Sequence, residues 1–244
     1  MSAVSVVMTV YNGRIFLSEQ INSVLRELLP NDEIIIVNDA STDDSLEYLN
    51  SIKSDLVRVY TNNLNIGVLK SFERGLKLAS REFIFLCDQD DIWIPGKREE
   101  FVKVFELDKS VSVVISDVQV IDANSDEISP SFMATRGGFN GGFMATLWRN
   151  RYLGCAMAFR REILAVALPI PGIVPMHDMW FGIIGKLFGK VVYLPRPFLK
   201  YRRHANNVSP AKRQTIKQMV KWRLALFCAV VFRIIKVRLN INRN

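Results

Sequence analysis

The residues with the clearest chemical potential are three carboxylates within four positions: Asp88, Asp90 and Asp91. They directly follow residues 83–87, an apolar run that ends in a cysteine and predicts a buried strand. Carboxylates this close repel one another and raise each other's pKa, so the cluster adds no stability by itself. A hard cation would relieve the repulsion, since Mg²⁺ is usually held by one or two carboxylates plus substrate phosphates. The alternative is a solvated acidic turn that caps the next helix.

The elements that position these acids alternate regularly along the first half of the chain. Strands are expected at residues 5–10, 33–37, 57–60 and 83–87, each but the last followed by a helical pattern. Such alternation predicts a parallel α/β sheet with right-handed connections. Polar side chains follow every strand, namely Tyr11, Asn12, Asp39, Asn62, Asn63 and the acids at 88–91. The carboxyl ends of parallel strands share one edge, so the pattern predicts a ligand site there.

The second half of the chain is less regular. Pro95 fits the first turn of a helix that runs to about residue 107, and strands are expected at 111–121, 154–159 and 191–194. Pro195 and Pro197 are expected to break the last of these strands. The glycine-rich segment 129–144 predicts a loop, either a mobile lid or acceptor loop or an ordinary surface loop. His177 and Asp178 open a further apolar helix.

Composition limits the class of protein. An apolar content of 49% predicts a globular chain. Three cysteines, without the spacing of a zinc site or a disulfide framework, favour a reducing compartment. The first ten residues look like a strand and not a signal peptide. The net charge of +8 is concentrated in the tail, where residues 196–244 hold 13 Lys or Arg and no acid, against 19 basic and 24 acidic residues in the rest.

The basic tail predicts a helix from about residue 212. Its longest apolar run, residues 224–232, is far shorter than the roughly 20 residues that span a bilayer. Basic and aromatic residues on one helix suit the membrane surface, where anionic headgroups attract Lys and Arg. The alternatives are a helix packed on the domain and a helix that pairs with a partner.

Four motifs in order resemble the family 2 inverting glycosyltransferases of the GT-A fold. They occupy residues 9–13, 37–43 and 88–93 and the pair His177-Asp178, within a similarity that covers about residues 3–210. The sequence is most similar to bacterial enzymes that build O-antigen and other surface polysaccharides. The run Asp-Gln-Asp-Asp-Ile-Trp, followed by Pro and Lys, resembles that of rhamnosyltransferases.

This resemblance implies an α/β GT-A fold, with a mainly parallel Rossmann-like sheet flanked by helices. Residues 1–210 would form the glycosyltransferase domain, with a nucleotide-sugar half at 1–110 and an acceptor half at 111–210. Residues 211–244 lie outside the resemblance, and their own basic and apolar residues predict an amphipathic, membrane-associating helix.

The resemblance also implies roles for single residues on the donor side. Asp90 would hold Mg²⁺ or Mn²⁺ on the diphosphate of a nucleotide sugar. Asp88 would either lie near the ribose or assist the metal. Thr9, Tyr11 and Asn12 belong to the segment that holds the nucleotide. Asp39 would bind the base, with helix capping as the alternative role. Arg202 and His204, in a Tyr-Arg-Arg-His motif at 201–204, would meet phosphate charge, although Arg202 could instead face solvent or lipid.

On the acceptor side, Asp178 is the expected catalytic base. The family usually has Glu-Asp at this helix start, and His177 departs from that pattern at the first position. A helix N-terminus lowers the basicity of a carboxylate and burial raises it, so the sequence leaves the outcome open. Asp178 could alternatively serve only as a helix cap.

The implied function is an inverting sugar transfer from a nucleoside-diphosphate sugar to a hydroxyl of a lipid-linked oligosaccharide. Rhamnose is favoured by similarity, while galactose, glucose and N-acetylglucosamine stay open. The implied location is the cytoplasmic face of the inner (plasma) membrane, where an anionic surface would hold a peripheral protein. Nucleotidyl transfer matches poorly, because it normally needs a glycine-rich phosphate loop near the first strand. A nucleic-acid-binding scaffold is disfavoured and no nucleic acid is expected, since the body outside the tail is net acidic.

Overall fold

A computed structural model describes residues 2–205, 207 and 215–241 of the chain. The first part alternates strand and helix, as the sequence predicts: β1 (Val4–Val10), α1 (Arg14–Leu25), β2 (Glu33–Asn38), α2 (Ser45–Ser51), β3 (Val57–Thr61), α3 (Val68–Leu78) and β4 (Phe83–Cys87). β1, β2 and β4 are buried throughout, which explains their continuous apolar and β-branched composition.

The second part is more mixed. It contains β5 (Ile92–Trp93), α4 (Lys97–Leu107), β6 (Val111–Ile121), β7 (Glu127–Ser129), η1 (Ala134–Arg136), α5 (Phe143–Trp148), η2 (Gly154–Ala156), β8 (Met157–Arg160), α6 (Ile163–Ala167), α7 (His177–Phe188), β9 (Lys190–Arg202) and α8 (Ile216–Ile241). The glycine-rich segment 129–144 thus holds a 3₁₀ turn and the start of α5 within its loops.

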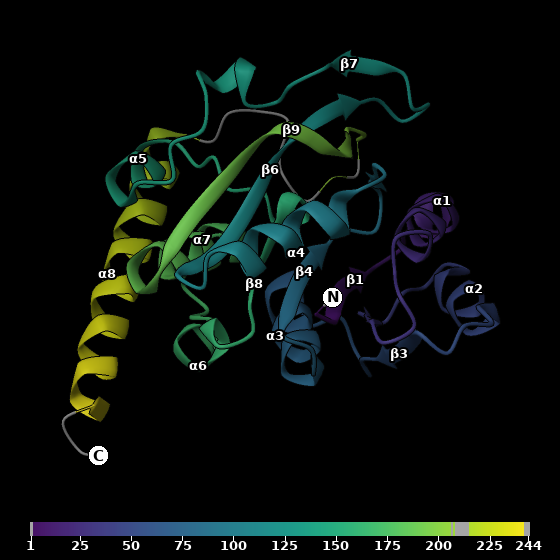
Figure 1. Cartoon of the computed structure of the whole chain (residues 1–244), viewed down its shortest axis with the longest axis horizontal. Coiled ribbons are helices and arrows are strands. Elements are labelled where there is room, and N and C mark those ends of the chain that lie inside the picture. The colour runs from purple at the N-terminus through teal and green to yellow at the C-terminus, as the bar shows by residue number, and fades with distance from the viewer. Residues whose placement is uncertain (1, 206, 208–214, 242–244) are drawn as a thin grey trace.

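Within the described residues, nine strands form one sheet in the order β3-β2-β1-β4-β8-β6-β9-β5, with β7 beside β6 (Figure 1). The pairs β3-β2, β2-β1, β1-β4 and β6-β9 are parallel. β8 runs antiparallel to β4 and β6, and β5 to β9. The prediction of a mainly parallel sheet flanked by helices is therefore confirmed. Because the sheet is continuous, the division into halves at residue 110 stays a prediction.

Two local predictions about prolines are wrong. Pro195 and Pro197 do not end a strand, because β9 runs on to Arg202 beside β6. The register shifts there: Leu194 pairs with Ser116, and Pro197 pairs with the next residue, Asp117. Two residues bulge out of the ladder, and proline is tolerated at bulges because no ladder hydrogen bond is required of it. Pro95 lies before α4, which begins after Gly96 in the left-handed conformation, φ 90°.

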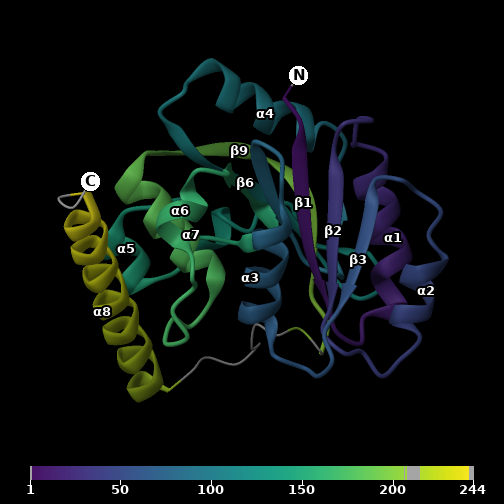
Figure 2. The ribbon, with the colours of Figure 1, turned by 90° about the horizontal axis from the view of Figure 1, so that it is seen from below.

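The tail forms the long helix α8 at the end of the molecule opposite α2, as both views show (Figures 1 and 2). α8 lies beside α5, and its side chains Leu226, Ala229 and Val230 are buried. Among the described residues, no helix is both long and apolar enough to cross a bilayer. Residues 211–214 and 242–244 of the predicted tail lie outside the described part of the chain.

Candidate active site

The carboxyl ends of β1, β2 and β4 and the start of α7 border a cavity of about 330 Å³. This is the edge of the sheet at which a ligand site was predicted. Six of the predicted site residues line the cavity: Thr9, Tyr11, Asp39, Asp88, Asp90 and Asp178. The cavity therefore brings together residues from three strand ends and from a helix almost ninety residues further along the chain.

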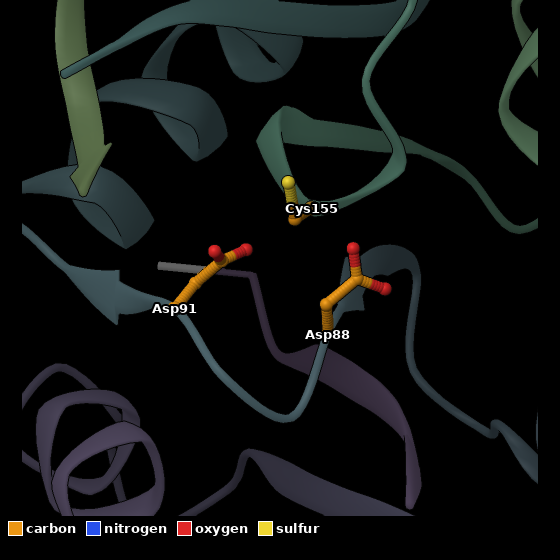
Figure 3. Close-up of side chains that lie close together, drawn as sticks. All are labelled: Asp88, Asp91 and Cys155. Atoms are coloured by element: carbon orange, nitrogen blue, oxygen red, sulfur yellow. The ribbon is translucent and has the colours of Figure 1, made fainter. Parts of the chain in front are cut away.

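The three clustered carboxylates occupy different environments. Asp88 and Asp90 line the cavity, whereas Asp91 does not. Asp91 is fully buried and accepts a hydrogen bond from the backbone N–H of Arg202, at 2.9 Å. Asp88 and Asp91 each place a carboxylate oxygen within 4.8 Å of the Cys155 sulfur and of each other, and both side chains point toward this cysteine (Figure 3).

Burial and mutual repulsion perturb these acids. Burial, followed by the charge of Asp90, raises the pKa of Asp88 to about 7 and the pKa of Asp91 well above its ordinary value. The ammonium of Lys97 is also buried and donates to the carbonyl oxygen of Cys155 at 2.6 Å. Its charge partly offsets that of the two carboxylates.

The cavity-lining acids fit a hard divalent cation. Asp88 and Asp90 offer oxygen donors on the cavity side, and Mg²⁺ and Mn²⁺ prefer oxygen ligands. The Cys155 thiol fits less well, because burial raises its pKa and keeps it protonated. A cation between the carboxylates would remove the repulsion that raises the pKa of Asp88.

His204 contacts Asp90, one of the two carboxylates that could bind a cation. Its Nε2 lies 2.8 Å from Asp90 Oδ2, and Asn207 Nδ2 donates to the same oxygen at 3.0 Å. The end of β9 and the residues after it therefore fold back over the acidic motif. His204 is not itself a lining residue of the cavity, but an imidazole nitrogen at this distance shares the space in which Asp90 would bind a cation.

Arg202 has a different setting from the one predicted. Its guanidinium is buried and donates to Glu19 Oε2 at 2.6 Å, to the carbonyl oxygen of Asp90 at 2.8 Å and to Ser125 Oγ at 2.9 Å. The side chain does not line the cavity. These contacts make Arg202 an anchor of the loop that carries Asp90, and its predicted contact with phosphate stays a prediction without geometric support.

Of the residues predicted to hold the nucleotide, Tyr11 lines the cavity and Asn12 does not. Tyr11 is half exposed at the cavity, and its backbone exchanges two hydrogen bonds with the side chain of Gln89, at 2.8 and 3.2 Å. Asn12 does not line the cavity; its side-chain oxygen accepts from the backbone N–H of Thr42 at 2.8 Å. Gln89 thus ties the end of β1 to the end of β4, a role that sequence reasoning did not foresee.

Asp39 lies on the cavity wall but already has three protein donors. Its Oδ1 accepts from Asn62 Nδ2 at 2.7 Å and from the N–H of Ile66 at 2.9 Å. Its Oδ2 accepts from the N–H of Gly67, at 2.9 Å. These bonds secure the loop that leads into α3, and Asp39 also lines the cavity. The helix-capping alternative is not supported, because neither α2 nor α3 receives a side-chain cap hydrogen bond.

Asp178 is a buried carboxylate in the first turn of α7. Burial raises its pKa to about 6, although hydrogen bonds from the N–H of Met179 at 2.6 Å and from Asn150 Nδ2 at 3.2 Å lower it. Burial therefore outweighs the stabilisation of the charged form, which answers the question that the sequence left open. Sequence reasoning missed Asn150, because nothing in a local pattern links it to a residue 28 positions away.

His177 is buried next to Asp178 and packs against Phe72, with ring centroids 4.1 Å apart and ring planes tilted by 32°. Neither ring nitrogen has a hydrogen-bond partner among the described residues, and burial lowers the pKa of His177 to about 4. The imidazole is therefore neutral at physiological pH.

Comparison with known proteins identifies the class to which this fold and site belong. Residues 5–167 match the family described as Glycosyl transferase family 2, so the chain belongs to this family. The predicted enzyme class, glycosyltransferase, is thereby confirmed.

Relatives extend the comparison. An uncharacterized glycosyltransferase of Nostoc sp. is 29% identical over 233 residues, which cover 89% of this chain and 70% of the relative. The Escherichia coli UDP-Glc:alpha-D-GlcNAc-diphosphoundecaprenol beta-1,3-glucosyltransferase WfgD is 30% identical over 122 residues, 50% of this chain and 48% of the enzyme. The match thus spans only about half the length of WfgD.

A solved structure supports the GT-A-like fold. TarS of S. aureus, in complex with UDP-GlcNAc, superposes with a TM-score of 0.68 over 90% of this chain and 64% of the TarS chain. The sequence identity is 18%, so this likeness concerns the fold alone.

Proposed function

We propose that the chain transfers a sugar, with inversion, from a nucleoside-diphosphate sugar to a hydroxyl group. One observation carries the proposal: the same cavity is lined by Asp88 and Asp90, which follow β4, and by Asp178, in the first turn of α7. Two groups of acids with separate tasks are what a displacement needs, since one end stabilises the leaving group and the other accepts a proton.

The residues would divide the reaction as follows. The bond between the anomeric carbon and the diphosphate oxygen breaks while the acceptor oxygen bonds to the same carbon from the opposite face. The acceptor's proton passes to Asp178, which is mostly ionised above pH 6, because its pKa is raised only to about 6. Asp90 and Asp88 would hold Mg²⁺ or Mn²⁺, and the bound ion would neutralise charge on the departing diphosphate. Thr9, Tyr11 and Asp39 would contact the nucleotide.

The donor and acceptor are proposed from the relatives. WfgD and its Escherichia coli counterpart WfaP are named as UDP-glucose enzymes acting on a GlcNAc-diphosphoundecaprenol. We therefore propose a lipid-linked saccharide as the acceptor and UDP-glucose as the first donor to test. Rhamnose, which the acidic motif favoured, gains no support from these relatives and joins galactose and N-acetylglucosamine as a further candidate.

The proposed location is the cytoplasmic face of the plasma membrane, where a peripheral protein would meet a lipid-linked acceptor. We also propose that residues 1–110 bind the donor. Residues 111–210 would face the acceptor, and the tail would face the membrane. The acceptor half supplies Asp178, Asn150 and α5, and α8 packs beside α5.

A donor panel tests the proposal. The protein would be incubated with UDP-glucose, UDP-galactose, UDP-N-acetylglucosamine and dTDP-rhamnose, each with Mn²⁺, with Mg²⁺ and with excess chelator. Metal-dependent release of the nucleoside diphosphate from one donor supports the proposal. Release at the same rate in chelator would contradict the role of the cation, and no binding of any nucleotide sugar would contradict the function.

A further inference from the structure

α8 presents two opposite faces. Leu226, Ala229 and Val230 are buried against the body, and the buried guanidinium of Arg233 donates to the carbonyl oxygens of Leu168 at 2.9 Å and Pro169 at 2.7 Å. These contacts fix the helix and its rotation about its own axis. The orientation of the other face follows directly from this anchoring.

The opposite face is an exposed apolar stripe. Its members recur every three or four residues, the spacing that aligns side chains along one side of a helix: Val220, Leu224, Phe227, Val231, Ile235 and Leu239. Phe232 adjoins the stripe and is 68% exposed. At 1.5 Å per residue, the stripe is roughly 30 Å long.

α5 extends this surface. Met144 and Trp148 are both more than 70% exposed. Arg223 of α8 donates to the carbonyl oxygen of Trp148 at 2.6 Å, and its guanidinium lies over the indole, 5.3 Å from the ring centroid. The rings of Phe143 and Phe227 lie 6.1 Å apart between the two helices. We call the stripe, Phe232, Met144 and Trp148 together the apolar face.

The charges around the apolar face distinguish between possible occupants. Lys217 and Lys221 precede most of the stripe, Lys236 and Arg238 lie near its other end, and α8 contains no Asp or Glu. A second copy of this helix would bring like charges together without an acid to pair them. An anionic bilayer surface complements both features, because apolar side chains enter the interface while Lys and Arg meet the headgroups.

We propose that the apolar face docks the protein on the surface of an anionic lipid bilayer, with α8 and Trp148 lying in the interface. This inference rests on the proposed function, and it identifies the surface by which the enzyme meets its membrane. Docking here would also orient the active site toward the acceptor. Asn150, which bonds the proposed base Asp178, lies two residues after Trp148, so the docked surface and the acceptor side of the cavity are one short segment apart.

Vesicle co-sedimentation of the full chain tests the proposal. Phosphatidylcholine vesicles with and without phosphatidylglycerol serve as probes. The apolar variant is Leu224→Gln, Ile235→Gln and Leu239→Gln, and its matched control is Leu64→Gln, Ile128→Gln and Leu107→Gln, since all six side chains are more than half exposed. The charge variant is Lys217→Gln, Lys221→Gln and Lys236→Gln, matched by the exposed Lys53→Gln, Lys103→Gln and Lys109→Gln.

We expect the wild-type protein to bind vesicles that contain phosphatidylglycerol and to be released as salt rises. Each test variant should bind at least about tenfold more weakly, and each control should bind like the wild type. Equal binding by test and control variants, or no binding by the wild type, would overturn the proposal. So would a wild-type dimer that the apolar variant dissociates, because the face would then serve a second copy.

Release of nucleoside diphosphate from the donor, measured in solution without vesicles, separates this proposal from the proposed function. The apolar and charge variants should keep the wild-type rate, because none of their residues lines the cavity. Normal vesicle binding without turnover would contradict the proposed function alone. Normal turnover without vesicle binding would contradict the docking surface alone.

Discussion

The side chain of Asn150 donates a hydrogen bond to Asp178, with Nδ2 and Oδ2 3.2 Å apart. The two residues come from different elements, since Asn150 follows α5 and Asp178 opens α7. Because a hydrogen-bond donor stabilises the ionised form, Asn150 holds down a pKa that burial raises. It is thus a positioning residue for the proposed base.

Replacing Asn150 should alter the pH dependence of transfer. Without its donor, the pKa of Asp178 should rise from about 6 by roughly one to two units, since a hydrogen bond to a charged group contributes about 1.5–3 kcal/mol. The acid limb of the kcat profile of Asn150→Ala should therefore shift to higher pH, with activity recovering in more alkaline buffer. The exposed Asn124→Ala is the control. An unshifted profile with lowered activity would indicate a merely structural role.

His204→Ala should weaken the cation site. The imidazole lies 2.8 Å from Asp90, so its removal takes away either a ligand or the partner that orients the ligand. We expect the metal concentration for half-maximal turnover to rise by about 10- to 100-fold, the usual effect of losing such a group. The measurement is a Mn²⁺ titration of turnover. Asp55→Asn, at an exposed carboxylate that does not line the cavity, should leave the titration unchanged. The same midpoint in His204→Ala would exclude a role at the cation.

Asp39→Asn separates the two roles of this residue. Three donors converge on its carboxylate, and an amide would turn an NH₂ group toward one or more of them. The loss of about 1–3 kcal/mol in free energy of unfolding should lower the Tm by several degrees, whereas the exposed Asp44→Asn should not. Calorimetry below the transition would then give the Kd for UDP. A Kd unchanged by Asp39→Asn would contradict contact with the base.

Asp178→Asn should stabilise the fold at alkaline pH. The pKa of Asp178 is raised in the folded chain, so the folded state holds its proton more tightly than the unfolded state, and stability falls as pH rises from about 4 to 6. Removing this carboxyl should raise the free energy of unfolding by about 1–3 kcal/mol at pH 8 and by much less at pH 4. Thermal unfolding at both pH values is the measurement. If the Tm of Asp178→Asn differed from that of the wild type by the same amount at both pH values, a buried Asp178 carboxyl that ionises between them would be contradicted.

Much of the fold could be predicted because its signals are local. The apolar, β-branched runs of β1, β2 and β4 identify buried strands, and the polar residues after them lie at one edge because parallel strands end together. The path of β9 could not be predicted, since a bulge at Pro195 keeps it paired with β6 across a register shift. A local sequence pattern contains the proline but carries no information about pairing with the neighbouring strand.

The candidate site could likewise be predicted only in part. The acids at 88–91 and Asp178 stand out by residue type, but only the folded chain separates Asp88 and Asp90, on the cavity wall, from Asp91, which is bonded to the backbone of Arg202. Arg202 itself looked suited to phosphate, yet its guanidinium is held by Glu19 and Ser125, residues distant in sequence. Such long-range partners decide whether a polar side chain faces a ligand or the protein.

The base at Asp178 is the central claim, and a paired measurement on Asp178→Asn tests it most directly. With the donor identified by the panel, turnover and the Kd for that nucleotide sugar would be measured for the wild type, for Asp178→Asn and for the exposed Asp55→Asn. We predict that Asp178→Asn loses turnover by about 100- to 10,000-fold, the range for a general base, while its Kd stays within about threefold and Asp55→Asn behaves like the wild type. Near-normal turnover in Asp178→Asn, or a loss of donor binding as large as the loss of turnover, would contradict the account.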